Sequence, residues 1–186
     1  MKLQGADTFT KLDAKDGYWN VKLSESSSYL TTFNTPWGRF RYTVLAFGLK
    51  MSQDVFQMKQ DEAYSGCNGI IGKADDITVY GKGEKSHDMH LHEAMEASRA
   101  ANITLNYSKI MFKSPSVKFF GNMYTKDGVK PDPDKIQAIV DLRRPEDKSE
   151  LRTFLGMVGY LQQFLPNLSE LEKPLREMDK SNVLFT

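Results

Sequence analysis

The chain has 186 residues, of which 40% are hydrophobic and 26% are charged, a composition typical of a soluble globular protein. Its 25 basic and 24 acidic residues give a net charge of +1, which neither requires nor excludes a nucleic-acid partner. Cys67 is the single cysteine, so an internal disulfide is excluded and an intracellular location, cytoplasmic or nuclear, is expected. No apolar run approaches the roughly 20 residues of a membrane helix, and we expect no membrane partner.

The first third of the chain predicts a strand, a hairpin and a helix. Residues 8–12 (TFTKL) have the pattern of a strand, which runs into Asp13. Residues 29–45 contain two β-rich runs on either side of TPWG, a sequence typical of a hairpin turn. Residues 52–66 (SQDVFQMKQDEAYSG) begin with Ser52 as the expected N-cap and end at a glycine, which predicts a helix.

The middle of the chain predicts two strands that meet at a pair of acids. Residues 68–81 (NGIIGKADDITVYG) contain two short strand-like runs, with Asp75 and Asp76 at their junction. Residues 86–102 place small and apolar side chains at helical spacing. Three short β-rich pieces follow within residues 103–125, around ITLN, IMFK and VKFFGNMYT.

The pattern becomes helical after KDGVKPDP, and we divide the chain there into residues 1–128 and 129–186. Three helices are predicted, at residues 135–142, 149–164 and 168–178. Apolar side chains at helical spacing within residues 154–165 favour packing in a core, and dimerisation through an exposed face is the alternative.

The three acids Asp13, Asp75 and Asp76 are candidates for a metal site. They meet if the strands that carry them are neighbours in one sheet, and converging carboxylates need a compensating charge, which a hard divalent cation supplies. Two such ions would activate a hydroxyl group and stabilise a leaving group in phosphoryl transfer. The alternative is that the pair is an exposed turn, since aspartate is a favoured turn residue.

Six segments of the chain, in register, resemble reverse transcriptases of gypsy-type LTR retrotransposons, which are RNA-directed DNA polymerases. They are KLDAKDGYWNVKL (11–23), TTFNTPWGRFRYTVLAFGLKMSQDVFQ (31–57), ADDITVYGK (74–82), ITLNYSKIMF (103–112), VKFFGNMYTKDGVKPDPDKIQAI (117–139) and LRTFLGMVGYLQQFLPNLSELEKPL (151–175). The resemblance implies an α+β fold, a ferredoxin-like polymerase palm whose antiparallel sheet has helices on one face, followed by a helical thumb segment. Residues 1–128 would then be the palm with part of the fingers hairpin, and residues 129–186 the primer-grip exit and thumb.

The resemblance also implies a catalytic and metal site. Asp13, Asp75 and Asp76 match the catalytic aspartates, which would hold two Mg²⁺ ions, with Mn²⁺ as a possible substitute. The backbone carbonyl of Ala14 would be a further ligand. Lys109 matches a lysine that the family brings near the nucleotide phosphates as a proton donor, and a solvated surface lysine is the alternative.

Three further residues match positions that contact the incoming nucleotide. Tyr18 stands where the family has an aromatic steric gate that excludes a 2′-hydroxyl; its alternative is an ordinary half-buried tyrosine. Phe47 and Gly48 belong to AFGLK, which matches the family's PFGL element. Phe47 would lie against the nucleotide, with a core phenylalanine as the alternative, and Gly48 would let the backbone approach the template–nucleotide pair.

The primer grip is the last site that the resemblance implies. Phe119, Phe120 and Gly121 fall in the hairpin that positions the primer 3′ end. The helices from Ser149 onward resemble the start of the thumb, which follows the backbone of the duplex.

Lys73 is a departure from the family pattern, because relatives carry an aromatic or aliphatic side chain two residues before the acid pair. A cation here could pair with Asp75 or Asp76 and lower the pKa of that carboxyl group, or compete with the metal. His87 and His90 lie close together on the helix predicted at residues 86–102, and we interpret them as structural or solvated, because a zinc site needs more ligands than they supply.

The function implied is nucleotidyl transfer from deoxynucleoside triphosphates to a primer 3′-hydroxyl on an RNA or DNA template. Further partners would be the fingers, connection and RNase H regions of a parent retrotransposon polyprotein. Because the family's fingers begin upstream of Asp13, we expect weak or absent polymerase activity from these residues alone. The alternative is a catalytically inactive remnant or host-retained fragment that acts as a nucleic-acid or protein binding module.

Overall fold

The computed structural model describes residue 3 and residues 5–180, and the chain divides into two compact units. The first unit comprises Met1–Phe120 and Tyr124–Gly128. The second unit comprises Gly121–Met123 and Val129–Thr186.

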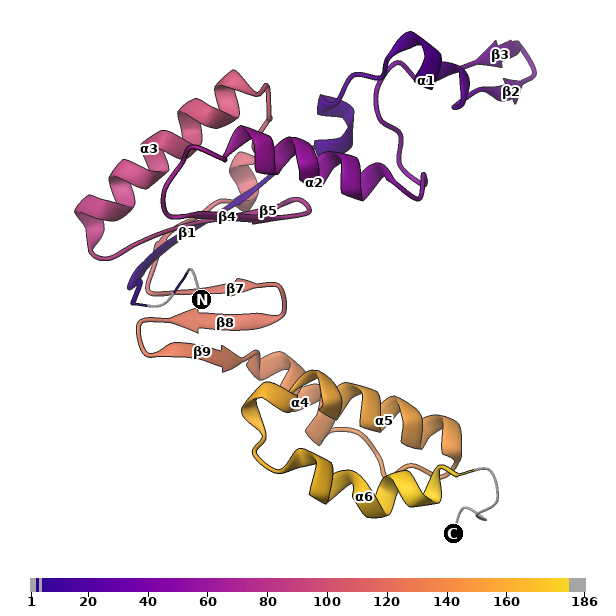
Figure 1. The fold of residues 1–186 in the computed structure, drawn as a ribbon, viewed down its shortest axis with the longest axis vertical. Coiled ribbons are helices and arrows are strands. Elements are labelled where there is room, and N and C mark those ends of the chain that lie inside the picture. Colours follow the sequence, from indigo (N-terminus) through magenta and orange to yellow (C-terminus); the bar gives the residue numbers. More distant parts are fainter. Residues whose placement is uncertain (1–2, 4, 181–186) are drawn as a thin grey trace. The chain divides into compact units, whose positions relative to one another are not determined.

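A four-stranded antiparallel sheet forms the centre of the first unit (Figure 1). Its strands follow the order β4–β5–β1–β6, with bounds Ile70–Lys73 for β4, Asp76–Gly81 for β5, Thr8–Asp13 for β1 and Met111–Ser114 for β6. The first predicted strand and the two strands predicted within residues 68–81 are therefore confirmed. Since β5 and β1 are the inner strands, the residues that they carry are the most closely surrounded.

One face of this sheet is covered by two helices, α2 (Ser52–Ala63) and α3 (Glu84–Ala100), as Figure 1 shows. Leu12 of β1 lies opposite Ile77 of β5, and both are almost completely buried in the core. Phe56 of α2 is fully buried in the same cluster. The predicted α+β fold, an antiparallel sheet with helices on one face, is confirmed.

Ser52 does not cap α2 as predicted. It is the first helical residue, and Met51 precedes it as an N-cap that makes no side-chain hydrogen bond. The Ser52 hydroxyl group donates instead to the carbonyl oxygen of Ala46, at 2.6 Å. This buried bond ties the start of α2 to the AFGLK segment, a long-range use of the hydroxyl group that a local capping rule does not foresee.

A second prediction was wrong at residues 103–106 (ITLN), which do not form a strand. Leu105 makes only an isolated antiparallel bridge with Ala14. The short 3-10 helix η2 (Tyr107–Lys109) follows, so that β6 begins only at Met111.

The hairpin predicted around TPWG is present. It consists of β2 (Phe33–Thr35) and β3 (Gly38–Phe40), and it follows two short helices, η1 (Gly17–Asn20) and α1 (Glu25–Tyr29). Its aromatic side chains are largely exposed, with Trp37 at 86%.

A second sheet has three strands, in the order β7–β8–β9. Its strands are Ser116–Phe119, Asn122–Thr125 and Gly128–Pro131. Phe120 and Gly121 join β7 to β8 with positive φ angles of 47° and 75°. Two successive residues with positive φ are typical of a tight two-residue hairpin turn.

The second unit contains helices α4 (Pro133–Val140), α5 (Lys148–Tyr160) and α6 (Leu168–Met178), with the short 3-10 helix η3 (Gln162–Phe164) between the last two. This agrees with the three predicted helices, except that the second ends earlier and continues as η3. Leu155 and Leu161 of the apolar stripe within residues 154–165 are buried, as expected for core packing, whereas Leu165 of the same stripe is 38% exposed.

Two histidines of α3 have structural roles, as predicted. His87 is completely buried, and its Nε2 lies 2.8 Å from the hydroxyl group of Thr10. The Nδ1 of His90 lies 2.7 Å from the carbonyl oxygen of Tyr80. Among residue 3 and residues 5–180, no helix is long and apolar enough to cross a membrane.

Phe56→Ala should destabilise the protein strongly, because the substitution leaves a cavity beneath the central sheet. We expect a loss of about 3–5 kcal/mol in the free energy of unfolding, measured by urea denaturation. Met58→Ala is the matched control on the same helix, since Met58 is 66% exposed. A loss for Phe56→Ala no larger than for this control would contradict the assigned core.

Candidate active site

Strand register brings the three predicted aspartates to one end of the central sheet. Asp13, the last residue of β1, lies opposite Asp76, the first residue of β5. Residues directly opposite each other on antiparallel strands project from the same face of the sheet. Asp75 precedes Asp76 in the turn after β4, and its carbonyl oxygen accepts a hydrogen bond from the Ala14 amide at 2.7 Å.

Two of these aspartates are paired with lysines. The Nζ of Lys109 lies 3.2 Å from both carboxylate oxygens of Asp13. The Nζ of Lys11 lies 2.9 Å from Oδ2 of Asp76. In the part of the chain that the structure describes, Asp75 has no ion pair of this kind.

The pKa of the Asp75 carboxyl group is raised above its ordinary value of 3.8. Partial burial is the largest cause, and repulsion by the charges of Asp13 and Asp76 adds to it, whereas Lys109 acts in the opposite direction. The site therefore contains three mutually repelling carboxylates, of which one lacks a counter-ion.

A cavity of about 280 Å³ lies beside these acids. Its lining consists of Asp13, Ala14, Lys15, Asp16, Gly17, Phe47, Asp75, Asn106 and Lys109. The structure therefore brings five of the predicted site residues together around one polar cavity. Asp76 is adjacent in the register of the sheet but is not part of this lining.

The predicted nucleotide-contacting aromatics lie next to each other. The ring centroid of Tyr18 is 4.7 Å from that of Phe47 and 5.7 Å from that of Phe56. Phe47 is 57% exposed, so the alternative of a core phenylalanine is wrong. Gly48 follows with φ +84°, a conformation that favours glycine, and a side chain added there would meet open space.

The predicted primer-grip residues do not line this cavity. Phe119 is buried against Tyr124, with ring centroids 6.4 Å apart, whereas Phe120 is 65% exposed. Gly121 belongs to the second unit, where a side chain at this position would collide with the Tyr160 hydroxyl group.

Lys73 forms neither of the ion pairs considered from the sequence. Its ammonium group lies 5.9 Å from the ring centroid of Phe120, a cation–π distance. Lys73 is opposite Asp76 in the β4–β5 register, yet Asp76 pairs with Lys11 instead. The charge of Lys73 is therefore directed toward the β7–β8 turn.

Gly17 is a site residue that sequence reasoning missed. A Cβ atom at this position would lie 2.6 Å from Cζ of Phe56 and 3.0 Å from Oδ1 of Asp75. The η1 backbone therefore packs directly between the core and the acids. Lys11 was missed as well, although its place two residues before Asp13 on the same strand indicates the same face of the sheet.

The chemical type of the available ligands, carboxylate oxygens, suits a divalent cation. Carboxylate oxygens are the ligands that Mg²⁺ prefers. Burial, and after it repulsion by Asp13 and Asp76, raises the pKa of Asp75, and bound cations would relieve that repulsion. Within residue 3 and residues 5–180, however, no group of three or more acidic, histidine or cysteine side chains is already arranged around a metal position. The contacts of Lys109 and Lys11 would have to rearrange for Asp13 and Asp76 to serve together as ligands.

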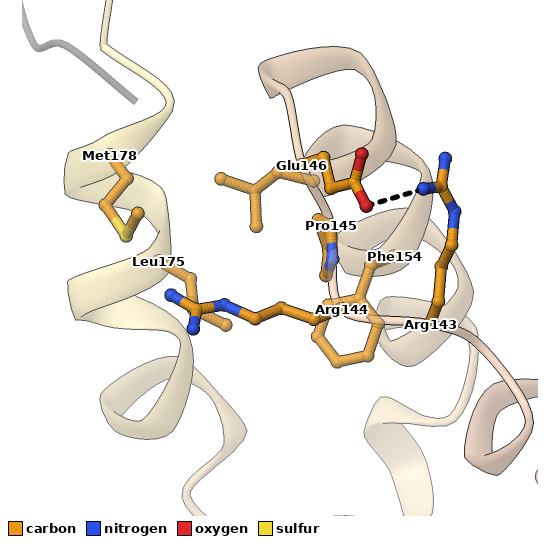
Figure 2. A pocket seen from close by; sticks show the side chains of 8 residues that line it. Arg143, Arg144, Pro145, Glu146, Phe154, Leu175 and Met178 are labelled. Atoms are coloured by element: carbon orange, nitrogen blue, oxygen red, sulfur yellow. Dashed lines mark ion pairs between the residues drawn. The ribbon is translucent and has the colours of Figure 1, made fainter. Parts of the chain in front are cut away.

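A larger cavity, of about 480 Å³, lies in the second unit between α6 and the segment that leads into α5 (Figure 2). Arg143 and Glu146 form an ion pair at 2.8 Å on one side, and Leu175 and Met178 of α6 face it from the other. Its mixed apolar and ion-paired lining contains none of the predicted site residues.

Asp75→Asn should stabilise the metal-free protein at neutral pH. Because the folded state holds the Asp75 proton more tightly than the unfolded state, stability falls as pH rises from near 3.8 through the raised pKa, and the ionised group costs stability above that range. We expect urea unfolding in the presence of EDTA to show the gain at pH 7 and none at pH 3. Asp76→Asn should give no gain, because it leaves Lys11 without its partner. Equal effects of the two substitutions would contradict this account.

Gly17→Ala should disturb both the core and the acids. We expect a loss of about 1–3 kcal/mol in the free energy of unfolding, because the ring of Phe56 or the η1 backbone must shift. Gly66→Ala, where a side chain meets open space, serves as the control and should change stability by less than about 0.5 kcal/mol. If the two variants unfold at the same urea concentration, the close packing at Gly17 is wrong.

Sequence comparison relates this chain to known proteins. A family model described as reverse transcriptase (RNA-dependent DNA polymerase) matches residues 1–124. The Transposon Tf2-3 polyprotein of Schizosaccharomyces pombe is 31% identical over 191 residues, which cover 98% of this chain and 14% of that polyprotein. The Transposon Tf2-7 polyprotein of the same organism is 30% identical with the same coverage. The chain thus spans 14% of the length of these relatives.

Solved structures show a similar fold. The foamy viral protease-reverse transcriptase in complex with double-stranded DNA has a TM-score of 0.87 at 22% identity, over 95% of this chain and 31% of that chain. The complex of the foamy viral enzyme with an RNA/DNA hybrid has a TM-score of 0.80 at 22% identity, over 93% of this chain and 24% of that chain. Together with the family match over residues 1–124, these findings establish that the chain belongs to the reverse transcriptase (RNA-dependent DNA polymerase) family.

Proposed function

We propose that this chain is the palm and the beginning of the thumb of a gypsy-type LTR retrotransposon reverse transcriptase, and that it extends a primer on an RNA or DNA template. The observation that carries the proposal is the register of Asp13 and Asp76 with Asp75 beside them, at the edge of a polar cavity. The Tf2 polyproteins support the retrotransposon origin, and the nucleic-acid complexes of the foamy viral enzyme support the class of partner.

Asp13, Asp75 and Asp76 would hold two Mg²⁺ ions, or Mn²⁺ in their place, with the Ala14 carbonyl as a further ligand. Bound there, the ions would activate the primer 3′-hydroxyl and stabilise the charge that develops on the phosphates. Attack of that hydroxyl group on the α-phosphate of a deoxynucleoside triphosphate forms the new phosphodiester bond and expels pyrophosphate.

Lys109 would bind the Asp13 carboxylate in the free protein and the nucleotide phosphates in the complex. Lys109 is one of the residues that line the cavity, and its side chain is 62% exposed, so its ammonium group has room to turn from Asp13 toward an arriving triphosphate. A proton held at Nζ could then be given to the pyrophosphate leaving group.

Tyr18 and Phe47 would form the aromatic wall of the nucleotide site. Phe47 and Phe56 both contact the ring of Tyr18, with ring centroids 4.7 Å and 5.7 Å from it. A ring held in this way resists displacement by a 2′-hydroxyl group, which would favour deoxynucleotides over ribonucleotides.

The β7–β8 turn would act as the primer grip. Phe120 of the turn is 65% exposed and lies near Lys73, the last residue of β4, so an exposed ring and a cation are found together. This combination suits a sugar–phosphate backbone, where the ring packs on the sugar and the ammonium group attracts phosphate.

The helices of the second unit would follow the duplex. A groove of about 440 Å³ lies along α4 and α5, and its basic members are Lys135 and Arg152. Gly156 in the groove leaves open space above α5, which permits close approach of a bulky polymer.

Primer extension tests the proposal. With an annealed primer–template, Mg²⁺ and deoxynucleotides, we expect the 186-residue chain to add nucleotides weakly, because it spans 14% of the length of its relatives. Asp75→Asn should abolish the addition, whereas Asp54→Asn on the exposed start of α2 should leave it unchanged. A chain extended by the flanking polyprotein regions should add nucleotides at least about tenfold faster.

No extension by either the short or the extended chain would contradict the proposed polymerase and leave the noncatalytic binding module. Retained binding of the primer–template, measured by fluorescence anisotropy, would then identify that module as a nucleic-acid binder.

A further inference from the structure

We propose that Gln57 and Gln60 of α2 are positioning residues that fix the β4–β5 turn, and with it the carboxylate of Asp75. That the two glutamines fix the turn follows from the hydrogen bonds that they make to it. The consequence of this role for metal binding rests on the proposed function.

The turn contains a backbone conformation that needs support. Ala74 has a φ angle of +52°, in the left-handed region that residues other than glycine adopt at a cost. Ala74 is also only partly exposed, so its backbone N–H and C=O groups need partners. Such a residue keeps its conformation only when its surroundings determine it.

Two side chains of α2 satisfy both backbone groups of Ala74. The Ala74 amide donates to Oε1 of Gln57 at 3.1 Å, and Nε2 of Gln60 donates to the Ala74 carbonyl oxygen at 3.1 Å. Gln57 and Gln60 are three positions apart, so they lie on one face of the helix. We call these two hydrogen bonds, from Gln57 and Gln60 to Ala74, the clamp. The clamp joins the strained residue Ala74 to helix α2.

The orientation of the Gln57 amide group is determined by its other contacts. Its Nε2 donates to Oδ1 of Asp61 at 2.8 Å and to the carbonyl oxygen of Gly72 at 3.2 Å. Oε1 of Gln60, at 3.5 Å, is a third and longer acceptor on the Nε2 side, so Oε1 of Gln57 is left to face the Ala74 amide. The side chain of Gln57 thus binds both Gly72 of β4 and Ala74 of the turn.

Gly72 shows how closely the helix approaches. Gln60 is 1% exposed, and a Cβ atom on Gly72 would lie 2.3 Å from its Oε1. Any side chain at position 72 would push Gln60 away from Ala74. The glycine is therefore part of the clamp, although its φ angle is ordinary.

Asp75 is held from both sides as a result. On one side the clamp fixes Ala74, and on the other the Ala14 amide binds the Asp75 carbonyl oxygen. These backbone restraints oppose the repulsion by Asp13 and Asp76, for which Asp75 has no ion pair in the described residues. A fixed carboxylate is what a metal site requires of its ligand.

Hydrogen exchange in the metal-free chain tests the clamp directly. We expect the Ala74 amide to exchange at least about tenfold faster in Gln57→Met, which removes its acceptor, and less markedly faster in Gln60→Met. The amide of Val79 in β5 reports global unfolding and should change much less. Gln53→Met, on the exposed first turn of α2, is the matched control and should leave Ala74 unchanged.

A compensating double variant distinguishes positioning from general packing. Gln57→Glu combined with Asp61→Asn keeps an acceptor toward Ala74 and reverses the donor and acceptor of the bond to position 61, but its second oxygen loses the bond to the Gly72 carbonyl oxygen. We expect the Ala74 amide of this double variant to exchange more slowly than in Gln57→Met, because its acceptor is kept, and faster than in the unmodified chain, because the bond to Gly72 is lost. If both methionine variants leave Ala74 exchange within twofold of the unmodified chain, or if the double variant exchanges as fast as Gln57→Met, the clamp is wrong.

Mn²⁺ binding, followed by electron paramagnetic resonance, tests the consequence separately. We expect about tenfold weaker binding in Gln57→Met than in Gln53→Met, because the Asp75 carboxylate is no longer held. Faster exchange at Ala74 with no Mn²⁺ binding in the unmodified chain would support the clamp and contradict the proposed metal site. Unchanged Mn²⁺ affinity in Gln57→Met, with binding intact in the unmodified chain, would contradict the link between the two.

Discussion

The repulsion among three carboxylates at one end of the central sheet is the constraint on which the rest of the site depends. Strand register places Asp13 and Asp76 opposite each other, and the turn adds Asp75 beside them. Lysines compensate the first two, through Lys109 and Lys11. Asp75, the third, is held through hydrogen bonds of the backbone. Ion pairs and backbone hydrogen bonds therefore both keep the acids together.

Helix α2 packs against both the core and the candidate site, so the two are structurally coupled. Phe56 fills the space beneath the sheet and limits position 17 to glycine, while Gln57 and Gln60 on the same helix reach the turn that carries Asp75. A shift of α2 would therefore move the acids as well as the core. The bond from Ser52 to Ala46, at the start of the helix, extends the connection to the segment that carries Phe47.

Sequence patterns predicted the acids but not what supports them. Asp13 follows a strand pattern and Asp75 stands at a strand junction, so local rules placed both acids at strand ends but left open whether they meet. The roles of Lys11 and Gln57 depend on which strands are neighbours and on where α2 crosses them, which a local pattern does not contain. Lys73 shows the same limit, because its contact with Phe120 depends on the β7–β8 turn rather than on the adjacent acids.

The two lysine contacts differ in how easily a cation would replace them. Lys109 is 62% exposed, and an ion pair so open to water contributes little, since hydration of the released ammonium group offsets most of the loss. Lys11 is 27% exposed and has less access to water, so its release from Asp76 is less favourable. A divalent cation arriving with its phosphates would therefore displace Lys109 first and gain Asp13, while Lys11 still neutralises Asp76. The two lysine contacts would thus be exchanged one after the other as the proposed metal binds, and their presence is no argument against the proposed site.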